Sequence, residues 1–145
     1  MFEFVGKKVA DAMSSPPVSV RDHTTLAEVD ALLDEHGFNG CPVVDGDGRL
    51  LGLVTGFDVL RAFRITPDAL VPPYHRIMAS PVVEHMRKAP ITMTPDTPLT
   101  RVLQRMLDLG NTGFPVVEEG RLVGVVTRRD VLRVLRECAP PGDGS

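Results

Sequence analysis

The sequence predicts a mixed α/β protein built from two copies of one unit, and two observations support this prediction. First, the segment GLVTGFDVLR at Gly52–Arg61 returns as GVVTRRDVLR at Gly124–Arg133. Second, each copy has the pattern of a buried strand that ends at a threonine and passes directly into a helix, with an aspartate three positions later. Self-similarity of this kind is the signature of a duplicated fold, so the other elements are expected to recur in the same order.

The duplication extends through most of the chain. Val9 matches Val82 at an offset of 73, and Asp58 matches Asp130 at an offset of 72, because the hairpin turn of the second copy is one residue shorter. Between these anchors, Gly, Pro and Thr landmarks stay in register. The sequence therefore predicts repeats at 7–63 and 82–136, a connector at 64–81 and a disordered tail at 137–145.

In the first copy, apolar periodicity and turn residues predict the elements one by one. Thr24 or Thr25 can cap the first long helix, Thr25 and Glu28 have the spacing of a capping box, and Gly37 is placed to end this helix. That helix carries an apolar stripe of Leu26, Val29, Leu32 and Leu33. The other expected elements are a helical lead-in over 4–13, a strand over 18–20, hairpin strands over 41–44 and 50–54 with a turn at 45–48, and a helix over 55–63.

The second copy repeats this order. Thr97 is expected to cap its long helix, with Pro98 at the first helical position. The other expected elements are a strand over 91–93 and hairpin strands over 114–117 and 122–126. The proline-rich connector is expected to be irregular, with one helical turn.

The predicted unit cannot bury all of its own apolar surface. A small sheet with helices on one face leaves its other face open, and each unit is near the lower size limit for independent stability. The other copy is therefore the natural cover for this open face.

Composition argues against several classes of protein. The net charge of −3 and the lack of a basic run disfavour nucleic acid polymers as partners, and no apolar run reaches the roughly 20 residues of a membrane span. The N-terminus lacks a signal-peptide pattern, and Cys41 and Cys138 are too isolated to suggest a disulfide framework or a metal site. We therefore expect a cytoplasmic protein. No nucleophile or acid–base set is visible, so an enzyme is not expected.

Each half of the chain resembles a CBS domain, the module first defined in cystathionine β-synthase. The resemblance rests on Asp11-Ala12-Met13, on the Pro-Val-Val strand with its acidic turn, and on the two G-x-x-T-x-x-D segments, and it covers about residues 7–136. It implies two repeats that pack sheet against sheet with pseudo-twofold symmetry, with two equivalent clefts between them. In CBS pairs these clefts take adenosine-containing ligands.

The repeated Thr and Asp have two interpretations. In the structural one, Thr55 with Asp58, and Thr127 with Asp130, only cap a helix, an effect of roughly 1 kcal/mol. In the functional one, the helix N-terminus attracts a phosphate and the carboxylate accepts hydrogen bonds from the two hydroxyls of a ribose. Residue types and spacing fit both interpretations.

The resemblance implies roles for further residues. The aspartates would hold the ribose, the threonines would face the phosphate, and the adenine would lie against the first strand and the approach to the hairpin proline. In the first copy these adenine-site positions are Val18, Ser19, Val20, Thr24, Phe38, Asn39 and Gly40. In the second copy they are Ile91, Thr92, Met93, Thr97, Asn111, Thr112 and Gly113.

The two predicted sites differ in charge. Arg129 precedes the aspartate of the second copy, where the first copy has Phe57, and arginine can bind phosphate through two hydrogen bonds. This difference favours the second copy as the site for an anionic nucleotide. Nucleotide-binding CBS pairs often carry a basic residue just before the hairpin proline, and this chain lacks one in both copies. AMP or S-adenosylmethionine therefore fits the sparse charge better than ADP or ATP.

Two functions follow from these features. The favoured one is a regulatory module that senses an adenosine-containing ligand, requires no cofactor, forms a homodimer and signals in trans to an effector protein. The alternative is a structural or dimerisation module that binds no ligand.

Overall fold

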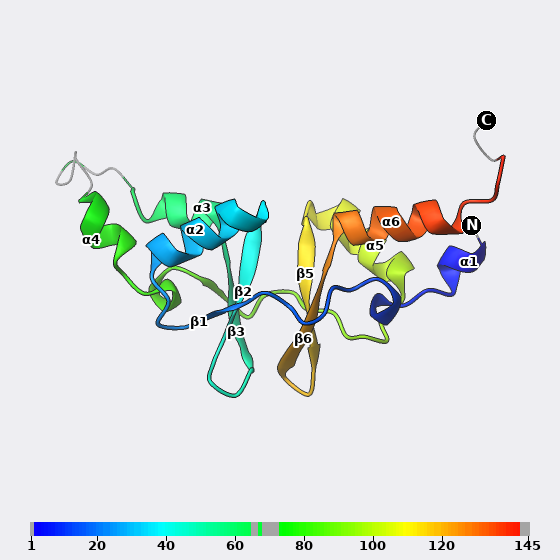
Figure 1. Ribbon diagram of the computed structural model, residues 1–145, viewed down its shortest axis with the longest axis horizontal. Helices are drawn as coiled ribbons and strands as arrows, with labels where there is room; N and C mark the ends of the chain where they lie inside the picture. The colour runs from blue at the N-terminus through cyan, green and yellow to red at the C-terminus, as the bar shows by residue number, and fades with distance from the viewer. Residues whose placement is uncertain (1, 65–66, 68–72, 143–145) are drawn as a thin grey trace. The chain divides into compact units, whose positions relative to one another are not determined.

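The computed structural model describes residues 2–64, 67 and 73–142, and the chain divides into two compact units (Figure 1). One unit is Val18–Pro90, which we call the Asp58 unit. The other combines Met1–Pro17 with Ile91–Ser145, and we call it the Asp130 unit. Both contain helices and strands, which confirms the mixed α/β class.

The Asp58 unit has a four-stranded sheet in the order β1-β2-β3-β4. Strand β1 pairs in parallel with β2, whereas β2 with β3 and β3 with β4 are antiparallel. The strands are β1 (Val20–Arg21), β2 (Gly40–Val44), β3 (Leu50–Thr55) and β4 (Arg87–Lys88). The helices are α2 (Leu26–His36), α3 (Gly56–Arg61), α4 (Tyr74–Met78) and the 3-10 turn η2 (Val82–Glu84).

The Asp130 unit has a two-stranded antiparallel sheet with single bridges on both sides. Met93 forms a parallel bridge with Val116, and Ser14 forms an antiparallel bridge with Val125. These bridges stand where β1 and β4 flank the hairpin of the other unit. The strands are β5 (Gly113–Glu118) and β6 (Arg121–Thr127), and the helices are α1 (Phe2–Val5), the 3-10 turn η1 (Val9–Asp11), α5 (Leu99–Leu109) and α6 (Arg128–Cys138).

Each unit is completed by the lead-in segment of the other repeat. In the Asp58 unit, the backbone N–H of Leu26 donates to the Ser80 carbonyl at 3.1 Å, and Val82 N–H donates to the Thr24 carbonyl at 2.7 Å. These bonds satisfy backbone groups at the start of α2 that a helix alone leaves unpaired.

The Asp130 unit uses the equivalent bonds. Leu99 N–H donates to the Lys7 carbonyl at 3.0 Å, and Val9 N–H donates to the Thr97 carbonyl at 2.8 Å. The ranges 7–63 and 82–136 therefore describe the duplication in the sequence, whereas each compact unit joins one hairpin and its two helices to the lead-in segment of the other repeat.

Each unit has its own core. The predicted stripe of α2 is confirmed, because Leu26, Val29 and Leu33 are buried and Leu32 packs against them. In the Asp130 unit, Val9 and Phe114 lie in one core with the apolar face of α5. Among the helices of the described residues, none combines the length and the apolar character needed to cross a bilayer.

The predicted capping of α2 is also confirmed. Thr25 is the N-cap, its hydroxyl accepts from Glu28 N–H at 3.2 Å, and the Glu28 side chain accepts from Thr25 N–H at 3.3 Å. Gly37 ends the helix with φ 67°, a left-handed conformation that glycine adopts without strain. Both predicted hairpins are present.

The prediction for Thr97 is wrong. Pro98 is the N-cap of α5, with φ −61° and ψ 139°, and no side chain caps this helix. The Thr97 hydroxyl instead accepts from Thr94 N–H at 3.0 Å in a local turn. Threonine readily forms such local bonds. The N–H of Leu99, at the start of α5, already donates to the Lys7 carbonyl of the lead-in segment.

The predicted first strands are shorter than expected. Only Val20 of the range 18–20 lies in β1, and only Met93 of the range 91–93 pairs with β5. In the second copy the chain soon reaches Pro95, which has no N–H for a ladder and accepts from Ala10 N–H at 2.9 Å. The lead-in over 4–13 contains two short pieces, α1 and η1, instead of one helix.

The connector and the tail differ from expectation in their extents. Helix α4 occupies five residues of the connector, and residues 65–66 and 68–72 lie outside the described residues. Helix α6 continues to the buried Cys138 and so includes the first two residues of the predicted tail. Of that tail, residues 143–145 lie outside the described residues.

Candidate functional site

The turn from β3 into α3 positions Asp58. Thr55 is the N-cap, with φ −123° and ψ 169°, and its hydroxyl accepts from Asp58 N–H at 3.4 Å. Asp58 Oδ2 in turn accepts from Thr55 N–H at 2.8 Å and from Thr55 Oγ1 at 2.9 Å. This reciprocal capping box holds the carboxylate over the start of the helix.

The turn from β6 into α6 repeats this geometry. Asp130 Oδ2 accepts from Thr127 N–H at 2.8 Å and from Thr127 Oγ1 at 3.0 Å. Asp130 N–H donates back to the Thr127 hydroxyl at 3.3 Å. The spacing of Thr and Asp thus predicted the local geometry correctly in both copies.

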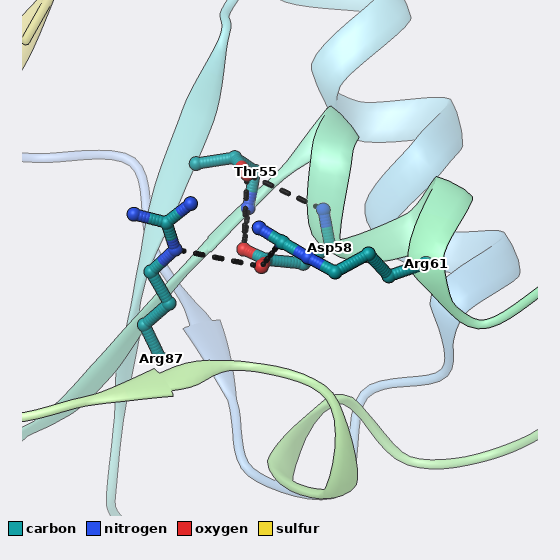
Figure 2. Close-up of polar contacts among 4 residues, drawn as sticks. All are labelled: Thr55, Asp58, Arg61 and Arg87. Atoms are coloured by element: carbon teal, nitrogen blue, oxygen red, sulfur yellow. Dashed lines mark hydrogen bonds and ion pairs between the residues drawn. The ribbon is translucent and has the colours of Figure 1, made fainter.

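Both aspartates are buried, with 4% of Asp58 and 7% of Asp130 exposed. A buried carboxylate is costly unless it is paired with opposite charge and hydrogen-bonded. Arg61 Nη1 donates to Asp58 Oδ1 at 3.2 Å, and Arg87 Nε forms an ion pair with the same oxygen at 3.6 Å, as Figure 2 shows. Asp58 therefore has two hydrogen bonds from Thr55 on one oxygen and two arginines on the other.

Asp130 has fewer partners. Arg133 Nη1 donates to Asp130 Oδ1 at 3.3 Å, and Arg133 Nη2 donates to the Ala12 carbonyl at 2.9 Å. An ionised carboxylate offers about four acceptor positions. Within the described residues, each aspartate accepts three side-chain or backbone hydrogen bonds, and Asp58 alone has a second arginine, Arg87, as an ion-pair partner.

Some of the predicted adenine-site residues lie beside the Thr–Asp turns. Gly40 pairs with Thr55 across β2 and β3, and the Asn39 carbonyl accepts from Gly56 N–H at 3.3 Å. A Cβ atom on Gly40 would lie 3.0 Å from the Val54 carbonyl, so this position favours glycine. The segment before Pro42 is therefore in direct contact with the Asp58 turn.

The Asp130 unit has the same contacts. Gly113 pairs with Thr127, and the Thr112 carbonyl accepts from Arg128 N–H at 2.9 Å. Asn111 precedes this pair in the chain. The approach to Pro115 therefore lies beside the second turn in the same way.

The other predicted residues are placed differently. The hydroxyls of Thr24 and Thr97 bind the backbone N–H groups of Arg21 and Thr94, so they serve local turns. Phe38 is half-exposed and stacks on His36 with ring centroids 4.9 Å apart. The rest lie on or beside the first-strand segments, where Val20 and Met93 are buried and Val18, Ser19, Ile91 and Thr92 keep some exposure.

Three arginines at the turns were missed by sequence reasoning. Arg61 and Arg133 follow their aspartates by three positions, a spacing that places charges together on a helix, so the repeated segment itself carried that signal. Arg87 had no such signal. Its contact with Asp58, 29 positions earlier in the chain, exists because β4 pairs with β3.

The chain belongs to the CBS domain family. The family model described as CBS domain matches residues 9–65 and 79–137. These two matches confirm the tandem pair that the internal repeat predicted.

Two solved structures of CBS pairs are similar over most of this chain. The crystal structure of CBSX2 in complex with AMP has a TM-score of 0.78 and 26% identity, covering 91% of this chain and 98% of that one. The CBS domain pair of protein MJ0100, in complex with 5′-methylthioadenosine and S-adenosyl-L-methionine, has a TM-score of 0.72 and 28% identity, covering 90% and 97%.

Longer proteins carry a similar segment. An A-adding tRNA nucleotidyltransferase of Aquifex aeolicus is 29% identical over 135 residues, which make up 93% of this chain and 15% of the enzyme. The corresponding share of a second such enzyme, from Geobacter sulfurreducens, is 13%. The chain therefore spans only a small part of these curated relatives.

Proposed function

We propose that this chain is a regulatory module that binds an adenosine-containing ligand, AMP or S-adenosylmethionine before ADP or ATP, and signals in trans to an effector protein. The observation that carries the proposal is the pair of buried aspartates, each held by a threonine at a strand-to-helix turn. Their carboxylates are oriented by the same bonds in both units, and carboxylates suit the hydroxyls of a ribose.

The similar structures support the ligand class. CBSX2 was crystallised with AMP, and the MJ0100 pair with S-adenosyl-L-methionine and 5′-methylthioadenosine. All three ligands share an adenosine group, which is the part that the Thr–Asp turn and the adjacent backbone would recognise. The proposed site comprises the Thr–Asp turns and the neighbouring residues named in the sequence analysis.

The experiment is chemical unfolding of the chain in the presence of AMP, ADP, ATP, S-adenosylmethionine, NAD and GMP. A ligand that binds only the folded state adds about 2.7 kcal/mol to the unfolding free energy at a hundredfold excess over Kd. We expect an increase with AMP or S-adenosylmethionine and none with GMP, and a smaller increase in Asp58→Ala and Asp130→Ala. Because both variants lower the baseline stability, each is compared with its own ligand-free form.

A ligand-free structural module is the second candidate function. The saturation of Asp58 by Thr55, Arg61 and Arg87 favours it, because a ribose hydroxyl would have to share or displace these partners. A flat response to the whole panel at millimolar concentration would select this candidate.

We also propose that the chain forms a homodimer through its helices. Leu60 and Leu132 occupy equivalent positions on α3 and α6, and their exposed fractions are 68% and 57%. Exposed apolar surface at equivalent places on both helices favours an interface there. Light scattering coupled to size exclusion measures the mass directly, and a mass of 15.8 kDa would contradict the dimer.

A further inference from the structure

The Asp58 unit contains a cavity that is lined almost entirely by ionisable side chains. Its volume is about 340 Å³, and its lining residues are Asp58, Arg61, Ala62, Glu84, His85 and Arg87. These residues come from α3, from the end of η2 and from β4. The cavity therefore forms only when the lead-in segment of the second repeat, which contains η2 and β4, packs against the first hairpin. Its volume lies at the lower end of the range for small-molecule sites.

The two arginines of this cavity contact Asp58 through one nitrogen each, so other N–H groups of both remain free to bind a solute. Arg87 contacts Asp58 through Nε, at 3.6 Å, and Figure 2 shows its two terminal nitrogens directed away from the carboxylate. Arg61 makes one hydrogen bond to Asp58 through Nη1. The Arg87 side chain is 60% exposed and the Arg61 side chain is 41% exposed, so donor groups of both are accessible to a solute.

The remaining ionisable groups are His85 and Glu84. The Ser80 hydroxyl donates to the Ile77 carbonyl, so its oxygen is left to accept from His85 Nε2 at 2.8 Å. This bond holds the imidazole in place at the cavity wall. Glu84 is exposed and makes no ion pair within the described part of the chain, so solvent screens its charge more than that of the paired Asp58.

The equivalent place in the Asp130 unit has one arginine instead of two and no histidine. Leu53 pairs with Arg87, and Val125 pairs with Ser14, so Ser14 stands where the Asp58 unit has Arg87. By the same register, Ala12 replaces His85. Arg133 is the counterpart of Arg61, and it makes one hydrogen bond more, because it donates both to Asp130 and to the Ala12 carbonyl.

We propose that the phosphate group of the ligand binds in the Asp58 unit, to Arg61 and Arg87, so that Arg87 gives this chain a preference for phosphorylated over unphosphorylated adenosine. The proposal rests on the proposed function for its adenosine part. A guanidinium group can bind a phosphate through two parallel hydrogen bonds. Because Arg61 and Arg87 both contact the Asp58 carboxylate, their guanidinium groups are oriented before the phosphate binds. This assignment differs from the one that Arg129 suggested in the sequence, which placed the anion in the Asp130 unit.

The test measures Kd for AMP and for adenosine by calorimetry in the wild type, Arg87→Ser and Arg129→Ala. Arg87→Ser introduces the residue that the other repeat carries at this position, and Lys88→Ser is a control that removes a neighbouring positive charge outside the cavity. We expect AMP to bind more tightly than adenosine in the wild type. The ratio of the two Kd values should fall about tenfold in Arg87→Ser, as for the loss of one charge-assisted contact, and stay unchanged in Lys88→Ser.

A further variant probes the sign of the charge effect. Glu84→Gln removes the acidic group of the lining that has no ion pair among the described residues, so AMP should bind more tightly while the Kd of adenosine stays the same. Weaker AMP binding in this variant would contradict an anion site in the cavity.

Several results would overturn the inference. Equal Kd values for AMP and adenosine in the wild type, or a ratio that Arg87→Ser leaves intact, would refute it while the proposed function stands. A ratio lost in Arg129→Ala instead would place the phosphate in the Asp130 unit.

If no adenosine compound binds, the proposed function fails, and inorganic phosphate decides the inference separately. Its titration should shift the NMR signal of the Arg87 Nε–H group in a saturable way. The absence of that shift would refute the phosphate site as well.

Discussion

Gly52 offers a direct test of how the Asp58 unit is built. It lies in β3, opposite Val43 of β2 and Lys88 of β4. A Cβ atom at this position would lie 2.5 Å from the Arg87 carbonyl oxygen and 2.8 Å from Met86 Sδ. A carbonyl oxygen cannot rotate away as a flexible side chain can, so β4 would have to retreat by roughly 1 Å to reach ordinary contact.

We therefore expect Gly52→Ala to lower the free energy of unfolding by about 1–3 kcal/mol, the usual cost of overpacking. Gly56→Ala is the matched control, because its Cβ meets nothing within 4 Å and it opens α3. That change should leave stability the same or raise it by about 0.4–1 kcal/mol. Gly124→Ala should act like Gly52→Ala but more mildly, since its nearest backbone oxygen, that of Ser14, is 3.0 Å away.

The assay is urea unfolding followed by circular dichroism, with linear extrapolation to water. Each variant is compared with the wild type at the same protein concentration, because a dimer would make stability depend on it. Equal stability of Gly52→Ala and Gly56→Ala would refute the close packing of β4 on β3, and with it the cavity at Asp58.

Two further predictions concern the turn of the second repeat and the buried thiol. Thr127→Ala should lower the unfolding free energy by about 1 kcal/mol, because the helix loses its cap. Thr127→Ser keeps a hydroxyl that can cap the helix, so its unfolding free energy should stay close to that of the wild type. Equal urea midpoints for the two variants would contradict the capping role. Burial raises the pKa of the Cys41 thiol from 9.0 to about 11. The thiol is thus favoured in the folded state, so stability should be fully present below pH 9 and fall as pH rises toward 11. Cys41→Ala should lose less stability over that window in pH-dependent unfolding, and identical pH slopes would show that the thiol does not titrate as expected.

Local elements were predictable because their determinants are close together in the chain. The capping boxes at Thr25, Thr55 and Thr127 each need an acidic residue three positions later, a distance that one helical turn spans. The hairpins likewise depend on a short turn. Thr97 was mispredicted because a competing turn with Thr94 was as local as the cap itself.

The candidate site was predictable in part. Asp58 and Asp130 were identified from the repeated segment, and the structure buries both. Their Arg partners at i+3 lay in the same segment and could have been found. The position of Arg87 could not, because it depends on a strand pair that joins separate parts of the sequence.

The sequence by itself determined the duplication, the two hairpins and the capped strand-to-helix turns, because periodicity and capping act over a few residues. The tertiary structure alone decided that the lead-in segment of each repeat completes the unit of the other. The physical reason is that the N-termini of α2 and α5 and the outer edges of the hairpins leave backbone groups unpaired, and any extended segment of the chain can satisfy them. Local sequence does not encode which segment does so, and that choice places Arg87 beside Asp58 and Ser14 in the equivalent position beside β6.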